Sequence, residues 1–198
     1  METNQQDSKI ITHNTKKIVI AAVVVAIIAA AALTSGLLMT NQNPSNNQKT
    51  SQTWMTKGAY ATYEGQATVL SMTVTFTAKM EIVDLNATHI QVSTNFNMST
   101  PFGATENTTT TWLSRENMTF QPDGLTLNNT YSTQVTLPNL GTRSCTVYEY
   151  ISQGISAAYY VDNSIQWPIK MIMTSPTSVD GQSYSMDINL VDTNIPGL

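Results

Sequence analysis

The chain has 198 residues, of which only 11% are charged, and its formal net charge is −4. Such a sparse, mildly acidic set of charges excludes nucleic-acid binding, which needs clustered Lys and Arg side chains, and electrostatic docking on anionic lipid. The single cysteine, Cys145, excludes an intramolecular disulfide. The length suits one folded domain together with a membrane segment.

An uncharged apolar stretch occupies residues 18–39. As a helix it would reach about 33 Å, which is enough to cross a hydrocarbon core of roughly 30 Å. Lys16 and Lys17 precede it directly, whereas the first basic residue beyond it is Lys49. This bias places the N-terminus in the cytoplasm and everything after Thr40 outside. We therefore expect a single-pass cell-membrane protein with an extracellular C-terminal domain.

The apolar stretch divides the chain into four parts. They are a cytoplasmic tail (1–17), a transmembrane helix (18–39), a flexible linker without large apolar side chains (40–53) and an exported β domain (54–198). Two alternatives to a retained anchor stay open. One is a signal peptide cleaved near Ala30–Ala32 or Thr34–Gly36, and the other is a pilin-type leader. A lipoprotein anchor is excluded because the only cysteine lies far downstream.

From residue 54 onward, hydrophobic residues recur with a period of two, which predicts β-strands. The clearest example covers 72–82, where Met72, Val74 and Phe76 alternate with threonines. The predicted strands, separated by turn signals, cover 58–68, 72–82, 89–98, 104–113, 130–137, 143–152, 155–161, 168–174 and 182–191. About nine or ten short strands at regular spacing predict a mainly β, antiparallel fold, either a curved sheet or a β-sandwich.

Few residues beyond the apolar stretch could carry catalysis. His89 follows a predicted turn and is expected to be exposed, while Cys145 alternates with apolar residues and is expected to be buried. No serine stands in a nucleophile motif, and the acidic residues are too scattered for a calcium loop. We therefore expect a protein that is not an enzyme and that has no metal site and no cofactor.

Glu149 shares a strand face with Cys145 and Val147, so its carboxylate could point into an apolar layer. Three interpretations stay open. In the first, the face that carries Glu149 is exposed to solvent, and Tyr148 and Tyr150 point inward. In the second, Glu149 forms a structural ion pair with Arg143, and in the third it faces a ligand.

Two further groups of residues have more than one interpretation. Five glycosylation sequons begin at Asn86, Asn97, Asn107, Asn117 and Asn128. They fall near predicted turns and strand ends, so glycosylation is plausible in a host that performs it. The methionines on strand faces could fill a core, bind copper(I) or line an adaptable apolar pocket.

The segments Val147–Tyr150, Ala158–Asp162 and Gln166–Met171 resemble the strand–turn–strand signature of LolA/LppX-type lipoprotein carriers. They also resemble a class of membrane-anchored archaeal surface proteins with such a β domain. The resemblance implies a strongly curved antiparallel sheet, a half-barrel whose concave face holds acyl chains. Two features depart from the family: no helix is predicted that would plug the concavity, and Ser164–Gln166 replaces the usual turn glycine.

If the sheet curves in this way, its concave face should bind an apolar ligand or lipid. The residues expected to line it are Met72, Val74, Phe76, Ile90, Val92, Met171 and Met173. The expected partners are the membrane, a lipid or other apolar ligand, and other envelope proteins. The alternative function is a structural or adhesive cell-surface component without a small ligand.

Overall fold

A computed structural model describes residues 54–69, 72–100, 103–115, 126–152, 155–175 and 184–198. The described part contains nine strands and no helix. The strands are β1 (Tyr60–Val69), β2 (Met72–Leu85), β3 (His89–Thr100), β4 (Gly103–Ser114), β5 (Thr126–Leu137), β6 (Gly141–Ser152), β7 (Ile155–Asp162), β8 (Pro168–Ser175) and β9 (Tyr184–Thr193). Each one overlaps a strand predicted from the period of two, which confirms the mainly β fold.

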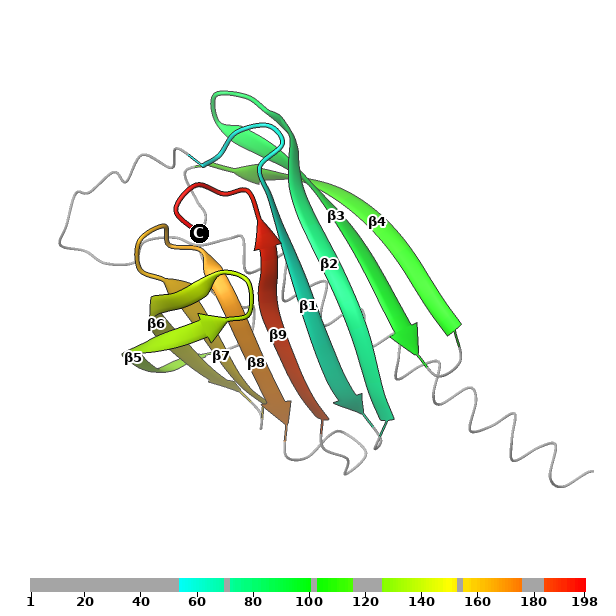
Figure 1. Ribbon diagram of the computed structural model, residues 1–198, viewed down its shortest axis with the longest axis vertical. Coiled ribbons are helices and arrows are strands. Elements are labelled where there is room, and N and C mark those ends of the chain that lie inside the picture. Colours follow the sequence, from blue (N-terminus) through cyan, green and yellow to red (C-terminus); the bar gives the residue numbers. More distant parts are fainter. Residues whose placement is uncertain (1–53, 70–71, 101–102, 116–125, 153–154, 176–183) are drawn as a thin grey trace, which may run out of the picture.

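All nine strands form one antiparallel sheet in the order β4-β3-β2-β1-β9-β8-β7-β6-β5. Two meanders, β1–β4 and β5–β9, are joined by the pairing of β1 with β9, so the first and last strands lie at the centre. Figure 1 shows that the sheet is strongly curved. The alternative of a β-sandwich is wrong, because the strands hydrogen-bond into one sheet that is not closed and that has β4 and β5 as its edges.

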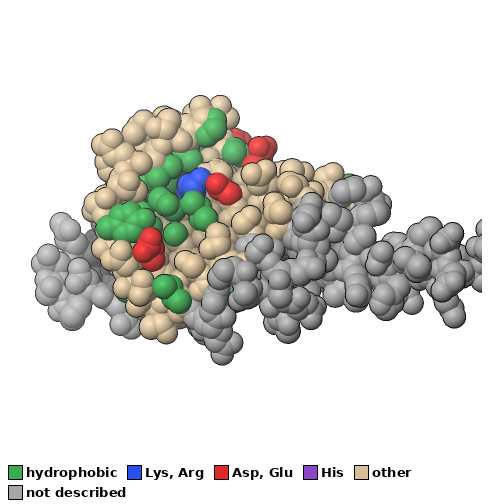
Figure 2. Space-filling model, turned by 90° about the horizontal axis from the view of Figure 1, so that it is seen from below, with side chains coloured by type: hydrophobic (Ala, Val, Ile, Leu, Met, Phe, Trp, Pro, Cys, Tyr) green, Lys and Arg blue, Asp and Glu red, His purple; other side chains and the backbone are tan. Residues whose placement is uncertain are grey.

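The alternation of side chains gives this sheet an apolar and a polar face. In β2, Val74, Phe76 and Met80 are buried, whereas Thr75 and Lys79 on the opposite face are exposed. Burial of each such apolar side chain stabilises the fold by about 1.5–3 kcal/mol, which fixes the register of the strand. Where the described surface is visible in Figure 2, few charged side chains lie among neutral polar and hydrophobic ones.

On the polar face, charged groups near the middle of the sheet are paired. The Lys170 ammonium on β8 donates to the Asp187 carboxylate at 3.0 Å and to the Asn189 side-chain oxygen at 3.0 Å, both on β9. Asn189 in turn donates to Asp187 at 2.9 Å. The network is partly exposed, so it contributes modestly to stability, and its main effect is to keep β8 and β9 in register.

The predicted tail, transmembrane helix and linker (1–53) lie outside the described residues, and so does the turn expected at 122–124. Among the residues that the structure describes, none forms a helix long and apolar enough to span a bilayer. The division of the chain at residues 18–39 therefore stays a prediction.

Candidate functional site

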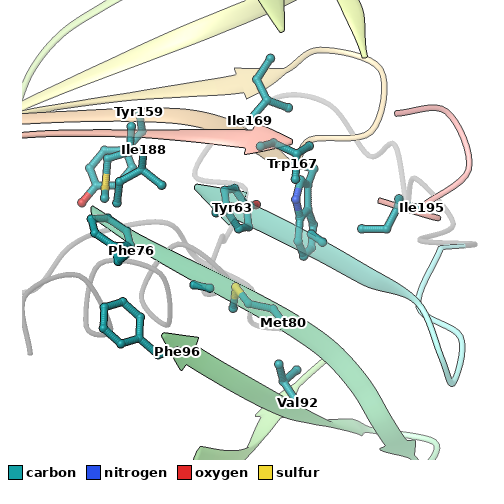
Figure 3. Packing of buried hydrophobic residues seen from close by; sticks show 14 of the residues in the cluster. Tyr63, Phe76, Met80, Val92, Phe96, Tyr159, Trp167, Ile169, Ile188 and Ile195 are labelled. Atoms are coloured by element: carbon teal, nitrogen blue, oxygen red, sulfur yellow. The ribbon is translucent and has the colours of Figure 1, made fainter. Parts of the chain in front are cut away.

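The strand register assembles a continuous apolar surface on the inner side of the curve, here called the concave face. One row of directly paired residues crosses six strands from β7 to β3. It consists of Tyr159, Met171, Ile188, Gly65, Phe76 and Met98. Figure 3 shows labelled side chains from β1–β3 and from β7–β9 gathered between the two halves of the curved sheet. Strands far apart in the sequence therefore contribute to one surface.

Six of the seven residues predicted to line the concave face belong to this one hydrophobic cluster. Their exposed fractions are all small: Val74 4%, Phe76 3%, Ile90 0%, Val92 5%, Met171 6% and Met173 7%. The seventh, Met72, begins β2 and pairs with Val69 of β1. The structure thus brings the predicted residues of β2, β3 and β8 to one face, and their role in ligand binding stays a prediction.

The absence of a side chain at Gly65 leaves space for the Phe76 ring. A Cβ atom at residue 65 would lie 2.3 Å from Cζ of Phe76 and 2.9 Å from the carbonyl oxygen of Asp187, so only glycine fits. The Phe76 ring also stacks on Phe96, with ring centroids 5.5 Å apart. The sequence offered no sign of this close approach, because an isolated glycine in a strand has several explanations.

Aromatic residues gather around one end of the concave face. Trp54, which precedes β1, contacts Trp167 edge to face with centroids 4.7 Å apart. The Tyr63 hydroxyl donates to the Pro168 carbonyl at 2.8 Å, and burial raises the pKa of Tyr63 far above its ordinary value. Within the part of the chain that the structure describes, the buried Trp167 indole N–H has no hydrogen-bond partner of good geometry. Its proximity to the Tyr63 hydroxyl partly offsets the rise in the pKa of Tyr63. This end is therefore packed by large rings.

A small cavity lies beside these rings. Its volume is about 10 Å³, and its lining includes Trp54, Met80, Ile82 and Trp167. It has room for a single water-sized group, and its lining is almost wholly apolar, so water gains few hydrogen bonds there. The described residues thus leave little empty space at this end of the concave face.

The turn between β7 and β8 explains the sequence signature on which the family resemblance rests. The buried Asp162 carboxylate accepts hydrogen bonds from the backbone N–H groups of Ser164 at 2.8 Å and Ile165 at 3.2 Å, and from the Ser164 hydroxyl. Gln166 adopts the left-handed backbone conformation with φ of 56°, which ordinarily favours glycine. These contacts hold the turn that leads to Trp167 at the end of the concave face.

The comparisons with known proteins establish no family for this chain. No family model matches the sequence, and no curated protein is similar to it. Four similar solved structures share 9% to 11% identity with it. A Bacteroides fragilis protein with a YmcC-like fold, provisionally described as exported, matches with a TM-score of 0.41 over 70% of this chain and 96% of its own.

Two further solved structures are similar at comparable levels. A provisionally described lipoprotein from Parabacteroides distasonis has a TM-score of 0.38, 10% identity, and covers 70% of this chain and 96% of its own. A provisionally described outer-membrane lipoprotein-sorting domain from Vibrio parahaemolyticus has a TM-score of 0.28 and 11% identity, and the match covers 73% of this chain and 87% of that domain. All these TM-scores are below 0.5, so the function must be argued from the concave face itself.

The ion pair expected between Glu149 and Arg143 does not occur among the described residues. The two residues lie six positions apart on β6, roughly 20 Å along a strand. Arg143 donates instead to the carbonyl oxygens of Leu140 at 3.1 Å and Gly197 at 2.6 Å, which ties the C-terminal segment to β6. Glu149 is half-buried and accepts from the Asn129 amide at 3.3 Å. Glu149 thus has a neutral neighbour on the polar side of the sheet.

Two predictions about reactive side chains are confirmed. Cys145 is fully buried, its Sγ lies 3.6 Å from the Arg143 carbonyl oxygen, and burial raises the pKa of the thiol to about 11. His89 is exposed, and its Nδ1 lies 2.8 Å from the Thr88 hydroxyl. In the described part of the chain, no three His, Cys, Asp or Glu residues are placed to hold a metal ion.

Four of the five sequon asparagines are exposed, namely Asn86, Asn97, Asn107 and Asn128. Asn117 lies outside the described residues. Asn86 caps the turn between β2 and β3 by accepting from the backbone N–H groups of Thr88 at 2.9 Å and His89 at 2.8 Å. The other three lie on strands, so the geometry leaves all four side chains accessible to a modifying enzyme, and their glycosylation stays a prediction.

Proposed function

We propose that the chain is a membrane-anchored protein of the cell envelope whose exported domain binds an apolar ligand, such as a lipid acyl chain, on its concave face. The observation that carries the proposal is the extent of the apolar surface. It continues without a charged side chain along the row from Tyr159 to Met98, across strands from both meanders. Within the described residues no helix or second sheet packs on this face.

The chemistry of the face suits a ligand without fixed shape. Met80, Met98, Met171, Met173 and Met186 are all buried in its cluster. Methionine side chains are unbranched and polarisable, and they repack easily around different apolar partners. An acyl chain that buries ten methylene groups gains roughly 8 kcal/mol at about 0.8 kcal/mol each, before the costs of association. Binding at micromolar concentration therefore requires no specific polar contact.

The proposed role is binding rather than catalysis, and the proposed location rests on residues 18–39. Their uncharged apolar sequence, with Lys16 and Lys17 on one side, supports a retained anchor with the β domain outside the cell. The linker of fourteen residues would span roughly 20 Å on average, which keeps the domain close to the lipid surface.

One observation favours a second candidate, a structural or adhesive surface component. The side chains of the concave face are already less than 10% exposed, and the cavity beside Trp167 is only about 10 Å³. On this alternative the concave face is a hydrophobic core that its own side chains fill, and it binds no ligand. On the first proposal the methionines rearrange when the ligand enters.

The test is the lipid content of the full chain purified from its own membrane. Lipid is extracted from the wild type, from a Met171→Gln/Met173→Gln variant and from Thr174→Gln, and the molar ratio of lipid to protein is measured by mass spectrometry. Met171 and Met173 lie on the concave face, whereas Thr174 is exposed on the same strand. We expect the double variant to lose bound lipid several-fold while Thr174→Gln retains it. A wild type free of lipid, or equal ratios in all three folded proteins, would favour the structural role.

A further inference from the structure

The two edges of the open sheet are protected to different degrees. An edge strand exposes unpaired backbone N–H and C=O groups, and proteins usually prevent edge pairing with lysines, prolines, bulges or short strands. β4 is twelve residues long and contains one charged residue, Glu106, and neither Lys nor Pro. Its pairing with β3 runs from Gly103 to Ser114 without a bulge. Among the described strands it has no other partner.

The opposite edge, β5, is less suited to pairing. Its register with β6 shifts at a bulge between Leu127 and Asn129. The turn that follows β5 contacts the centre of the sheet, where the Asn139 amide donates to the Val191 carbonyl of β9 at 3.4 Å. A bulged strand that is tied in at one end does not offer a straight row of backbone groups. Among the strands that the structure describes, β4 is thus the regular open edge.

We propose that β4 is a self-association edge, which pairs antiparallel with β4 of a second copy of this chain. The occupant is a second copy because the strand is complementary to itself. All side chains from Gly103 to Trp112 are exposed, and five of them are threonines. With a two-fold axis at Thr109, that residue faces its own copy, and Thr108 faces Thr110 of the second copy. Cross-strand Thr–Thr pairs are favourable.

The same register avoids electrostatic repulsion. Glu106, the only charged residue of β4, faces Trp112 of the second copy rather than another carboxylate. The pairing is isologous and closes after two copies, as most soluble homo-oligomers do, whereas pairing of β4 with β5 would continue into a fibre. The dimer would extend the sheet across two molecules and leave both concave faces free, so it is independent of ligand binding.

The experiment uses the full chain in detergent, produced in cells that do not N-glycosylate so that Asn107 in β4 stays unmodified. Thr109→Cys tests proximity, because a two-fold pairing brings the introduced thiols together and mild oxidation gives a covalent dimer. Ser132→Cys on β5 is the matched control, since Ser132 is also exposed and lies on the other edge. The native Cys145 is fully buried and does not interfere. We expect at least tenfold more crosslinked dimer from Thr109→Cys than from Ser132→Cys.

A second pair of variants measures affinity. Thr109→Lys places two like charges opposite each other, so we expect the dimer dissociation constant, measured by light scattering or ultracentrifugation, to rise at least tenfold. Ser132→Lys should leave it unchanged. Circular dichroism checks that all variants fold. A monomeric wild-type chain, a dimer that Thr109→Lys leaves intact, or equal crosslinking from β4 and β5 would each overturn the proposal.

Discussion

Strand β2 lies next to the central strand β1, whereas β6 lies next to the edge strand β5, and the two bury their side chains differently. β2 buries one face throughout, from Val74 to Ile82. β6 changes its buried face along its length: Cys145 and Val147 are buried on one face, and Tyr150 is buried on the other. Beyond Val147, the residues on the first face become partly exposed, and Ile151 is 45% exposed. The same alternation of residue types thus gives two burial patterns.

The difference follows from the neighbours of each strand. From Val74 to Ile82, the alternate apolar residues of β2 point to the concave face, where both halves of the sheet contribute large side chains. On β6, the fully buried Val147 pairs with Tyr131 of β5 and Tyr160 of β7, which place two large side chains on the same face beside it. Glu149 lies between Asn129 and Ala158, which are too small to cover it. Which face of a strand is buried therefore depends on the adjacent strands as well as on the alternation of its own side chains.

The largest effect is expected at the concave side of β2. Phe76→Ala removes a buried ring that stacks on Phe96, and it should lower the free energy of unfolding by about 3–5 kcal/mol. Thr75→Ala, one residue away on the exposed face, should change it by less than about 0.5 kcal/mol. Urea unfolding of both variants measures the contrast. Similar losses from the two substitutions would contradict the one-sided burial of β2.

A smaller effect is expected where β1 meets β2. Gly65→Ala introduces a Cβ atom that clashes with the Phe76 ring, so it should destabilise the fold by about 1–3 kcal/mol through overpacking. In a Phe76→Leu background the clash with the ring is relieved and only the close contact with the Asp187 carbonyl oxygen remains, so the cost of the alanine should fall. A double-mutant cycle measures this coupling. Additive losses would show that the glycine is not required by the ring.

Alkaline pH tests burial in both meanders at once. Burial raises the pKa values of Tyr63 in β1 and Tyr159 in β7, and that of Cys145 in β6 to about 11. Folding favours the protonated forms of these three groups. Their contribution to stability is complete at pH values below their ordinary pKa values, and it is lost as the pH rises through their raised pKa values in the folded protein. The urea midpoint should be lower at pH 11 than at pH 8. Tyr159→Phe should reduce the difference, and equal midpoints would contradict the burial.

The smallest effect is expected at Glu149. Because the Glu149 side chain is half-buried and its hydrogen-bond neighbours Asn129 and Tyr131 are neutral, Glu149→Gln should cost less than about 1 kcal/mol. Val147→Ala, two residues earlier on the same face, removes fully buried methyl groups and should cost about 1–3 kcal/mol. Urea unfolding of the pair gives the comparison. A larger loss at Glu149 than at Val147 would reverse the assignment of the two environments.

The period of two was sufficient to predict all nine described strands, because each depends on side chains within one strand. The face that Val74, Phe76, Met171 and Met173 share across two strands was expected only from the curved sheet that the resemblance implies. The pairing of β1 with β9 could not be predicted, since strand order depends on contacts between the two ends of the chain. For the same reason, the sequence did not indicate that Gly65 and Phe76 interlock. The predicted ion pair between Glu149 and Arg143 was wrong, because two residues on the same strand face can lie too far apart to touch.

The most direct test of ligand binding on the concave face is photo-labelling of the purified full chain with a single diazirine-bearing fatty acid. Protease digestion and mass spectrometry then locate the labelled residues. We predict labels in β2 around Val74 and Phe76 and in β8 around Met171 and Met173, in addition to any in residues 18–39. Label confined to residues 18–39, or to the exposed Leu127 and Ile151, would contradict the account.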